Sequence, residues 1–286
     1  MTNSSTVNPE DCTLQTCSLD YARIDYIPSL PANATYLSFF SLILVVQIGL
    51  GSRYRTWGFM AGMFCGILLE ILGYIGPAFV SASIYLCLGR LINTIGAEIS
   101  RFKPRTYACV FVFCDVISIL LQVVGGAITA SARDNYQDAN ARRVRQKGVH
   151  IMLGGLAYQV FSLTLFMILW GEFSLRASKA PAEMKNQGFE KLRSTFKFKA
   201  FRPALWLATI CIFIRSVFRV VELNQGFGGP IANNEPSFLV LEGPMIIIAT
   251  GVLTIFHPGV CFAGNWDAAD WSLRAEDKGN KDKQSL

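Results

Sequence analysis

The sequence predicts an all-α protein, a polytopic bundle of membrane-spanning helices. Apolar side chains make up 52% of the 286 residues and charged ones only 16%, too apolar a composition for an ordinary soluble domain. Several apolar stretches approach or exceed the roughly 20 residues that a helix needs to cross a bilayer. The basic residues gather in loops beside these stretches, so the net charge of +6 indicates a membrane as partner and no nucleic acid.

The polar leader, residues 1–33, lacks the apolar core of a cleavable signal peptide. Glycosylation sequons begin at Asn3 and Asn33, and Cys12 and Cys17 lie close together. These features indicate that the leader faces the lumen or the cell exterior, with the two cysteines either bonded or free.

Five apolar helices follow from length alone. They are expected at residues 34–50, 107–130, 149–170, 204–221 and 238–256. Arg53 and Arg55 follow the first of them and indicate a cytoplasmic loop. Residues 261–286 have mixed charges and few apolar side chains, which predicts a disordered cytoplasmic tail. The transmembrane domain is therefore expected at residues 34–260, between leader and tail.

The second apolar region, residues 57–92, has two interpretations. It is interrupted only by Glu70, Gly76-Pro77 and Arg90. As one helix it would measure about 54 Å, far more than a bilayer requires; as two helices it has almost no turn. The distribution of basic residues, together with the sequons, favours two crossings. We therefore expect seven helices, the second and third being short or fused around Gly76-Pro77.

Ionisable residues recur within the apolar stretches. Arg215, Arg219 and Glu222 are spaced by four and three residues, so they share one helix face. Holding ionised groups in hydrocarbon costs several kcal/mol each, by rough estimate, so they face protein or a wet cavity. Glu70 continues a face of glycines spaced by four. We predict that seven residues line one substrate-binding cleft: Glu70, Asp115, Gln122, Arg215, Arg219, Glu222 and Glu242.

Two interpretations of this set remain open. The cleft could receive the charged headgroup of an amphipathic lipid or lipophilic small molecule while its tail stays in the bilayer. Alternatively, salt bridges such as Asp115 or Glu70 with Arg215 or Arg219 only lock the helices together. For any single residue the two interpretations have equal support. For the seven residues together, the lipid-binding cleft is favoured.

Enzymatic chemistry has little support. Zinc hydrolases use about three histidines, or histidines with carboxylates, and the chain has only His150 and His257. Neither the GxxxxGK[ST] phosphate loop nor Gly-x-Ser-x-Gly occurs. We expect no enzyme, no catalytic residue, no metal and no cofactor, and a membrane hydrolase is a distant third possibility.

Several stretches together carry a family resemblance. They are EILGYIG (70–76), PAFVSASIYLCLGR (77–90), DVISILLQVVGGAI (115–128), RSVFRVVELNQGFGG (215–229), Glu235 and FHPG (256–259). In this combination the chain resembles the fungal lipid-translocating exporter family, the RTA-like seven-helix membrane proteins. Family members are linked to sphingoid long-chain-base export and to resistance to 7-aminocholesterol.

The resemblance implies ATP-independent translocation or export of amphipathic lipids, sphingoid long-chain bases or lipophilic toxins, across a fungal membrane. It implies a multi-pass protein of the plasma membrane, or else of a vacuolar or other endomembrane. The alternative function is a seven-helix lipid sensor, or a regulator of membrane lipid asymmetry without transport activity.

The chain departs from the family pattern between the GYIG and PAF motifs. Relatives usually carry an extra segment there, whereas Gly76 runs straight into Pro77. The chain therefore resembles a family member that lacks this segment, through a genuine deletion or a gene-model artefact.

Overall fold

The computed structural model of the chain describes residues 29–71, 76–131, 139–224, 240–266 and 268–269. All regular secondary structure in these ranges is helical, which confirms the all-α prediction. The main helices are α1 (Leu30–Arg53), α2 (Trp57–Ile71), α3 (Gly76–Ile95), α4 (Pro104–Ser131), α5 (Ala139–Lys179), α7 (Phe196–Asn224) and α9 (Gly243–Ile255). In the described ranges, 6 helices are long and apolar enough to cross a membrane, and α2 is a shorter apolar helix. The polytopic bundle predicted from the sequence is confirmed.

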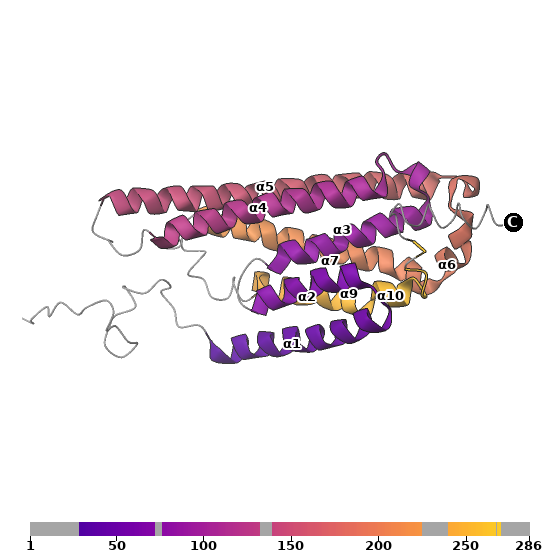
Figure 1. Cartoon of the computed structure of the whole chain (residues 1–286), viewed down its shortest axis with the longest axis horizontal. Helices are drawn as coiled ribbons and strands as arrows, with labels where there is room; N and C mark the ends of the chain where they lie inside the picture. The colour runs from indigo at the N-terminus through magenta and orange to yellow at the C-terminus, as the bar shows by residue number, and fades with distance from the viewer. Residues whose placement is uncertain (1–28, 72–75, 132–138, 225–239, 267, 270–286) are drawn as a thin grey trace, which may run out of the picture.

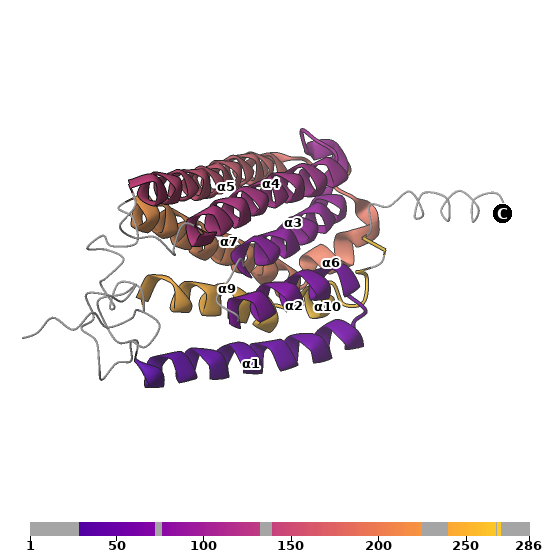
Figure 2. The same ribbon diagram turned by 60° about the vertical axis from the view of Figure 1, so that its left-hand side comes forward.

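The helices pack side by side in layers. α4 and α5 form a pair on one side of the bundle, and α1 lies at the opposite side (Figure 1). α2, α3, α7 and α9 lie between them (Figure 2). We call the end of the bundle where α1 begins the leader end, and the end where α1 finishes the loop end.

The ambiguous second region is a helical hairpin. A Cβ atom added at Gly58 would meet Leu86, and one added at Gly62 would meet Ser83 and Phe79. Along this contact the residue numbers rise on α2 and fall on α3, so the two helices run antiparallel. A single long helix over this region is therefore excluded. Gly76 and Pro77 belong to the first turn of α3, where proline is tolerated. With 15 residues, α2 measures only about 22 Å.

α4 and α5 approach closely through glycines. A Cβ atom added at Gly125 would lie 2.6 Å from both the Gly148 carbonyl oxygen and the Met152 backbone nitrogen. A Cβ atom added at Gly155 would likewise lie 2.9 Å from the Ser118 carbonyl oxygen. Small residues at such positions allow two membrane helices to bring their backbones together.

Four of the described helices, α1, α4, α5 and α7, extend beyond the expected spans. The span expected at 149–170 is part of α5, which has 41 residues and ends at Lys179. The span expected at 204–221 is part of α7, which begins at Phe196. Glu172 pairs with Arg176 one turn later at 2.6 Å, an arrangement that stabilises a helix in water. α1 likewise begins at Leu30 rather than at residue 34.

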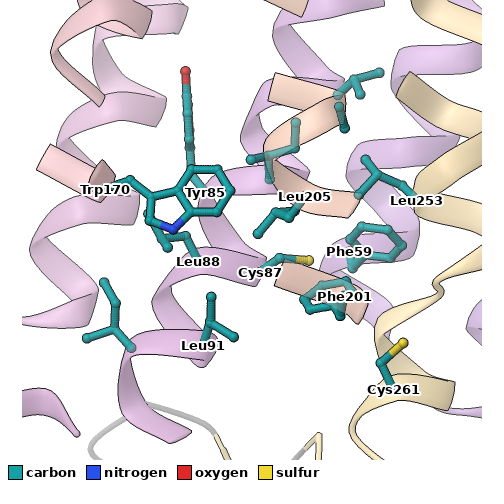
Figure 3. Close-up of a cluster of buried hydrophobic side chains, with 14 of the residues drawn as sticks. Phe59, Tyr85, Cys87, Leu88, Leu91, Trp170, Phe201, Leu205, Leu253 and Cys261 are labelled. Carbon is teal, nitrogen blue, oxygen red and sulfur yellow. The ribbon is translucent and has the colours of Figure 1, made fainter. Parts of the chain in front are cut away.

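Aromatic side chains fill the centre of the bundle. Tyr85 of α3, Trp170 of α5 and Leu205 of α7 meet between their helices (Figure 3). The Trp170 and Trp206 rings stack, with centroids 4.2 Å apart and planes 12° apart. Burial of such large side chains dominates packing energetics.

The loop end is closed by polar and aromatic contacts. The Arg193 guanidinium group donates to the carbonyl oxygens of Thr94 and Ile95 at the end of α3, each at 3.3 Å. Arg90 lies over the Trp266 ring, 4.0 Å from its centroid. Phe262 and Trp266 are buried, so the packed region continues past the boundary expected at Cys261. Residues 1–28 of the leader, with Asn3, Cys12 and Cys17, lie outside the described residues, as do residues 270–286 of the tail.

We expect Gly125→Ala to destabilise the protein by about 1–3 kcal/mol, because its methyl group would push against backbone atoms of α5. Gly126→Ala is the matched control, since a Cβ atom there meets nothing within 4 Å. The measurement is the fraction of purified protein that stays monodisperse in detergent after heating. Equal losses in the two variants would contradict this account of the interface.

Candidate functional site

Five of the seven predicted site residues form one ion-pair network. The Arg215 Nη2 atom lies 2.8 Å from Glu70 Oε1 and 3.0 Å from Glu242 Oε1. The Arg219 Nη1 atom lies 3.0 Å from Glu222 Oε2 and 3.5 Å from Glu242 Oε1. We call Glu70, Arg215, Arg219, Glu222 and Glu242 the ion-pair network. It ties α2, α7 and the start of α9 together.

Local sequence explains how the network assembles. The spacing of four and three residues places Arg215, Arg219 and Glu222 on one face of α7. Glu70 is the penultimate residue of α2, on the glycine face that packs against neighbouring helices. Glu242 is the N-cap residue of α9, where the partial positive charge of a helix N-terminus favours a carboxylate. These positions place the network toward the leader end.

Burial within the network is graded. The Arg215, Glu70 and Glu242 side chains are only 10%, 9% and 11% exposed, whereas Arg219 is 43% exposed. The network therefore runs from a buried centre to the molecular surface at Arg219.

The network contains more acids than bases. Three carboxylates face two guanidinium groups, which leaves one formal negative charge when all five groups are ionised. Oε2 of Glu70, Oε2 of Glu242 and Nε of Arg215 are buried without a hydrogen-bond partner. Unsatisfied buried polar atoms are costly. The two carboxylate oxygens can each accept from a further donor, whereas the Arg215 Nε–H group can only donate.

The other two predicted residues lie in different interfaces. Asp115 faces α3, and its Oδ2 atom lies 2.5 Å from Ser81 Oγ. Gln122 faces α5 and donates to Gln159 Oε1 at 3.2 Å. Among the described residues, no hydrogen bond or ion pair joins Asp115 or Gln122 to the ion-pair network. Of the suggested salt bridges, Glu70 with Arg215 is present, and Asp115 pairs with neither arginine. A single cleft lined by all seven residues remains a prediction.

Sequence reasoning missed the partners of Asp115. Ser81 and Tyr85 are four residues apart on α3, and both lie beside the Asp115 carboxyl group. The spacing shows that they share a helix face, but only the packing of α3 on α4 shows which residue they meet.

His257 lies between two helices. Its Nδ1 atom accepts a hydrogen bond from the Gly259 backbone at 3.1 Å. It therefore caps the next short helix, α10 (Pro258–Cys261). In the described parts of the chain, no cluster of three or more His, Cys, Asp or Glu side chains forms a potential metal site.

Comparison with known proteins gives a consistent family match. The profile of a family described as "RTA1 like protein" matches residues 54–265. The sphingoid long-chain base transporter RSB1 of Saccharomyces cerevisiae is 27% identical over 288 aligned positions, covering 83% of this chain and 74% of the relative. Protein RTA1 of the same species is 28% identical, covering 81% and 68%. The probable lipid transporter atnI of Emericella nidulans is 24% identical, covering 66% and 49%. No solved structure matches.

The alignment with RSB1 also bears on chain length. It is 288 positions long yet covers 83% of this chain, so the relative has residues without a counterpart here. That the missing positions fall between α2 and α3 remains a prediction.

We expect Arg215→Met to destabilise the protein by about 3–5 kcal/mol, because it leaves the buried Glu70 carboxylate without a cation and Glu242 with only its 3.5 Å contact to Arg219. Adding Glu70→Gln and Glu242→Gln should recover most of the loss by removing their charges. Arg219→Met should cost less, since Arg219 is half exposed. Thermal unfolding in detergent measures all three variants. A triple variant no more stable than Arg215→Met would show that the network is not held by this charge balance.

Proposed function

Because the chain belongs to the RTA1-like family, we propose that it moves amphipathic lipids across a fungal membrane without hydrolysing ATP. The chain is an integral, multi-pass membrane protein, and the plasma membrane is its proposed location. Two relatives are named as lipid transporters, one of them specifically for sphingoid long-chain bases. These names support a role in lipid transport for this chain.

The excess carboxylate in the buried ion-pair network supports the proposal most directly. A sphingoid base carries an amino group that is protonated near neutral pH. Its single positive charge would balance the negative charge of the network. Its N–H donors match the unpartnered Oε2 atoms of Glu70 and Glu242. Hydrogen bonds to charged groups contribute about 1.5–3 kcal/mol each, which helps to offset the cost of removing the headgroup from water.

Entry of the headgroup would begin at Arg219. This side chain is the most exposed of the network and contacts both Glu222 and Glu242. Its longer contact, 3.5 Å to Glu242, is the weaker one. An incoming ammonium group would take the place of Arg219 at Glu242, while Arg219 keeps its pair with Glu222. The hydrocarbon tail would remain among the apolar side chains at the surface of α7, such as Val217 and Val221.

In this proposal the headgroup meets the five residues of the ion-pair network first. Asp115 and Gln122 lie on α4, in contact with α3 and α5, and would line later parts of the route. A lipid sensor without transport activity would use the same headgroup site, so transport itself must be measured.

The test is lipid flip in liposomes that contain the purified protein and a fluorescent long-chain base. We expect Glu222→Gln to slow flip about tenfold, because Arg219 loses the charged partner that would hold it away from Glu242. Losing one such charged hydrogen bond costs at least about 1.4 kcal/mol. Glu172→Gln is the matched control: it removes the same charge from α5, outside the network, and should leave flip unchanged.

Three outcomes separate the hypotheses. Slow flip in Glu222→Gln, with normal flip in Glu172→Gln, supports headgroup recognition by the network. Equal flip in wild type and Glu222→Gln contradicts it. Saturable binding of the labelled base without protein-dependent flip would favour the sensor.

A further inference from the structure

Asp115 is a buried acid without a basic partner. Its side chain is in the middle of α4, and the residue is 3% exposed. It forms a hydrogen bond with Ser81 of α3. An ionised carboxylate in such a place would cost several kcal/mol, by rough estimate.

The contacts of Ser81 indicate whether the Asp115 carboxyl group carries a proton. Its Oγ atom lies 2.8 Å from the Ala78 carbonyl oxygen and 2.5 Å from Asp115 Oδ2. A hydroxyl group has one proton to donate, whereas a carbonyl oxygen and a carboxylate oxygen both only accept. Both contacts are hydrogen bonds at the same time if Asp115 is protonated. The carboxylic acid then donates to Ser81, and Ser81 donates to Ala78.

The other polar groups around Asp115 are neutral. From α3 the neutral Tyr85 hydroxyl group lies beside the carboxyl group and interacts with it. This hydroxyl points away from the apolar cluster that surrounds the ring (Figure 3). From α5, Tyr158 donates to the Cys114 sulfur atom at 3.4 Å, next to Asp115 on α4. No arginine, lysine or histidine of the described residues contacts Asp115, so a proton is the cation that balances it.

We propose that Asp115 is a proton-binding site and that lipid movement by this protein is coupled to proton release and uptake there. This proposal rests on the transport function proposed above. In the closed bundle Asp115 is a neutral acid. When α3 and α4 separate enough to admit water, the O–H bond of the acid breaks, the carboxylate keeps the electron pair, and water takes the proton. Reprotonation from water reverses the step.

The α2–α3 hairpin connects this proton site to the ion-pair network. Ser83 of α3 packs against Gly62 of α2, and its hydroxyl reaches the Phe59 carbonyl oxygen at 3.5 Å. Two residues earlier on α3, Ser81 contacts Asp115. Glu70, near the end of α2, contacts Arg215. A headgroup that weakens the Glu70–Arg215 pair would free the hairpin to shift, and the same shift would strain the Ser81–Asp115 contact.

The first experiment tests protonation without transport. Infrared spectroscopy of the purified full-length protein at neutral pH should show the C=O stretching band of a protonated carboxylic acid. Asp115→Asn should lose this band, and Glu172→Gln should keep it. Ser81→Ala should shift the band, because the acid loses its hydrogen-bond acceptor. An unchanged spectrum in Asp115→Asn, or in Ser81→Ala if the asparagine variant does not fold, overturns the proposal.

The second experiment tests coupling. Liposomes carry the full-length protein, a pH-sensitive dye in the lumen, and a fluorescent long-chain base added outside. An imposed gradient should change the final distribution of the base by about tenfold per pH unit if one proton moves per lipid. Asp115→Asn and protein-free liposomes under the same gradient measure the distribution that the amine reaches by itself. The asparagine variant should produce no luminal pH change beyond that of protein-free liposomes.

The outcomes separate this inference from the proposed function. Wild-type flip without a luminal pH change, and with the same distribution as Asp115→Asn, overturns proton coupling and leaves transport standing. Absence of protein-dependent flip overturns both.

Discussion

A guanidinium group held between two carboxylates joins three helices of this bundle. Arg215 of α7 contacts Glu70 from the end of α2 and Glu242 at the start of α9. Hydrocarbon does not solvate ionised groups, so each of these residues requires the others. The requirement fixes where α2 ends against α7 and how α9 enters the bundle. It also leaves Arg219 at the surface end of the same network, where an ionic headgroup would first arrive.

The short α2–α3 hairpin occupies the centre of the proposed mechanism. Its glycine face brings α2 within contact of Ser83, while the other side of α3 carries Ser81 against Asp115. The two helices therefore contribute Glu70 to the ion-pair network and contact the isolated acid of α4. The hairpin thus links the ion-pair network, whose charges do not balance, to the lone carboxyl group of Asp115.

Sequence periodicity predicted the helices and the shared face of α7. The spacing of Arg215, Arg219 and Glu222 was sufficient, because side chains four and three residues apart on a helix must lie together. The glycine spacing before Glu70 likewise predicted that this acid faces protein. The pairing of Asp115 with Ser81 was not predictable, since it depends on how α3 and α4 rotate against each other. Arg215 was matched with Glu70 only as one of several possible pairs, for the same reason.

Hydropathy alone also did not predict where the helices end. α5 continues to Lys179 as a polar helix, supported by its Glu172–Arg176 pair. A search for apolar stretches does not detect such a local interaction. Trp266 packs under Arg90 although its neighbours in sequence are polar, so composition alone suggested an unstructured tail. Where the antiparallel hairpin turns was unpredictable as well, because Gly76-Pro77 fits a turn and a first helical turn equally.

The most direct measurement of the central claim is an experimental structure of the full-length protein with a sphingoid long-chain base bound. The account predicts that the base nitrogen lies within hydrogen-bond distance of Glu70 or Glu242, with Arg219 displaced from Glu242 and still paired with Glu222. A base bound only on the lipid-facing surface, with all ion pairs of the network unchanged, would contradict it.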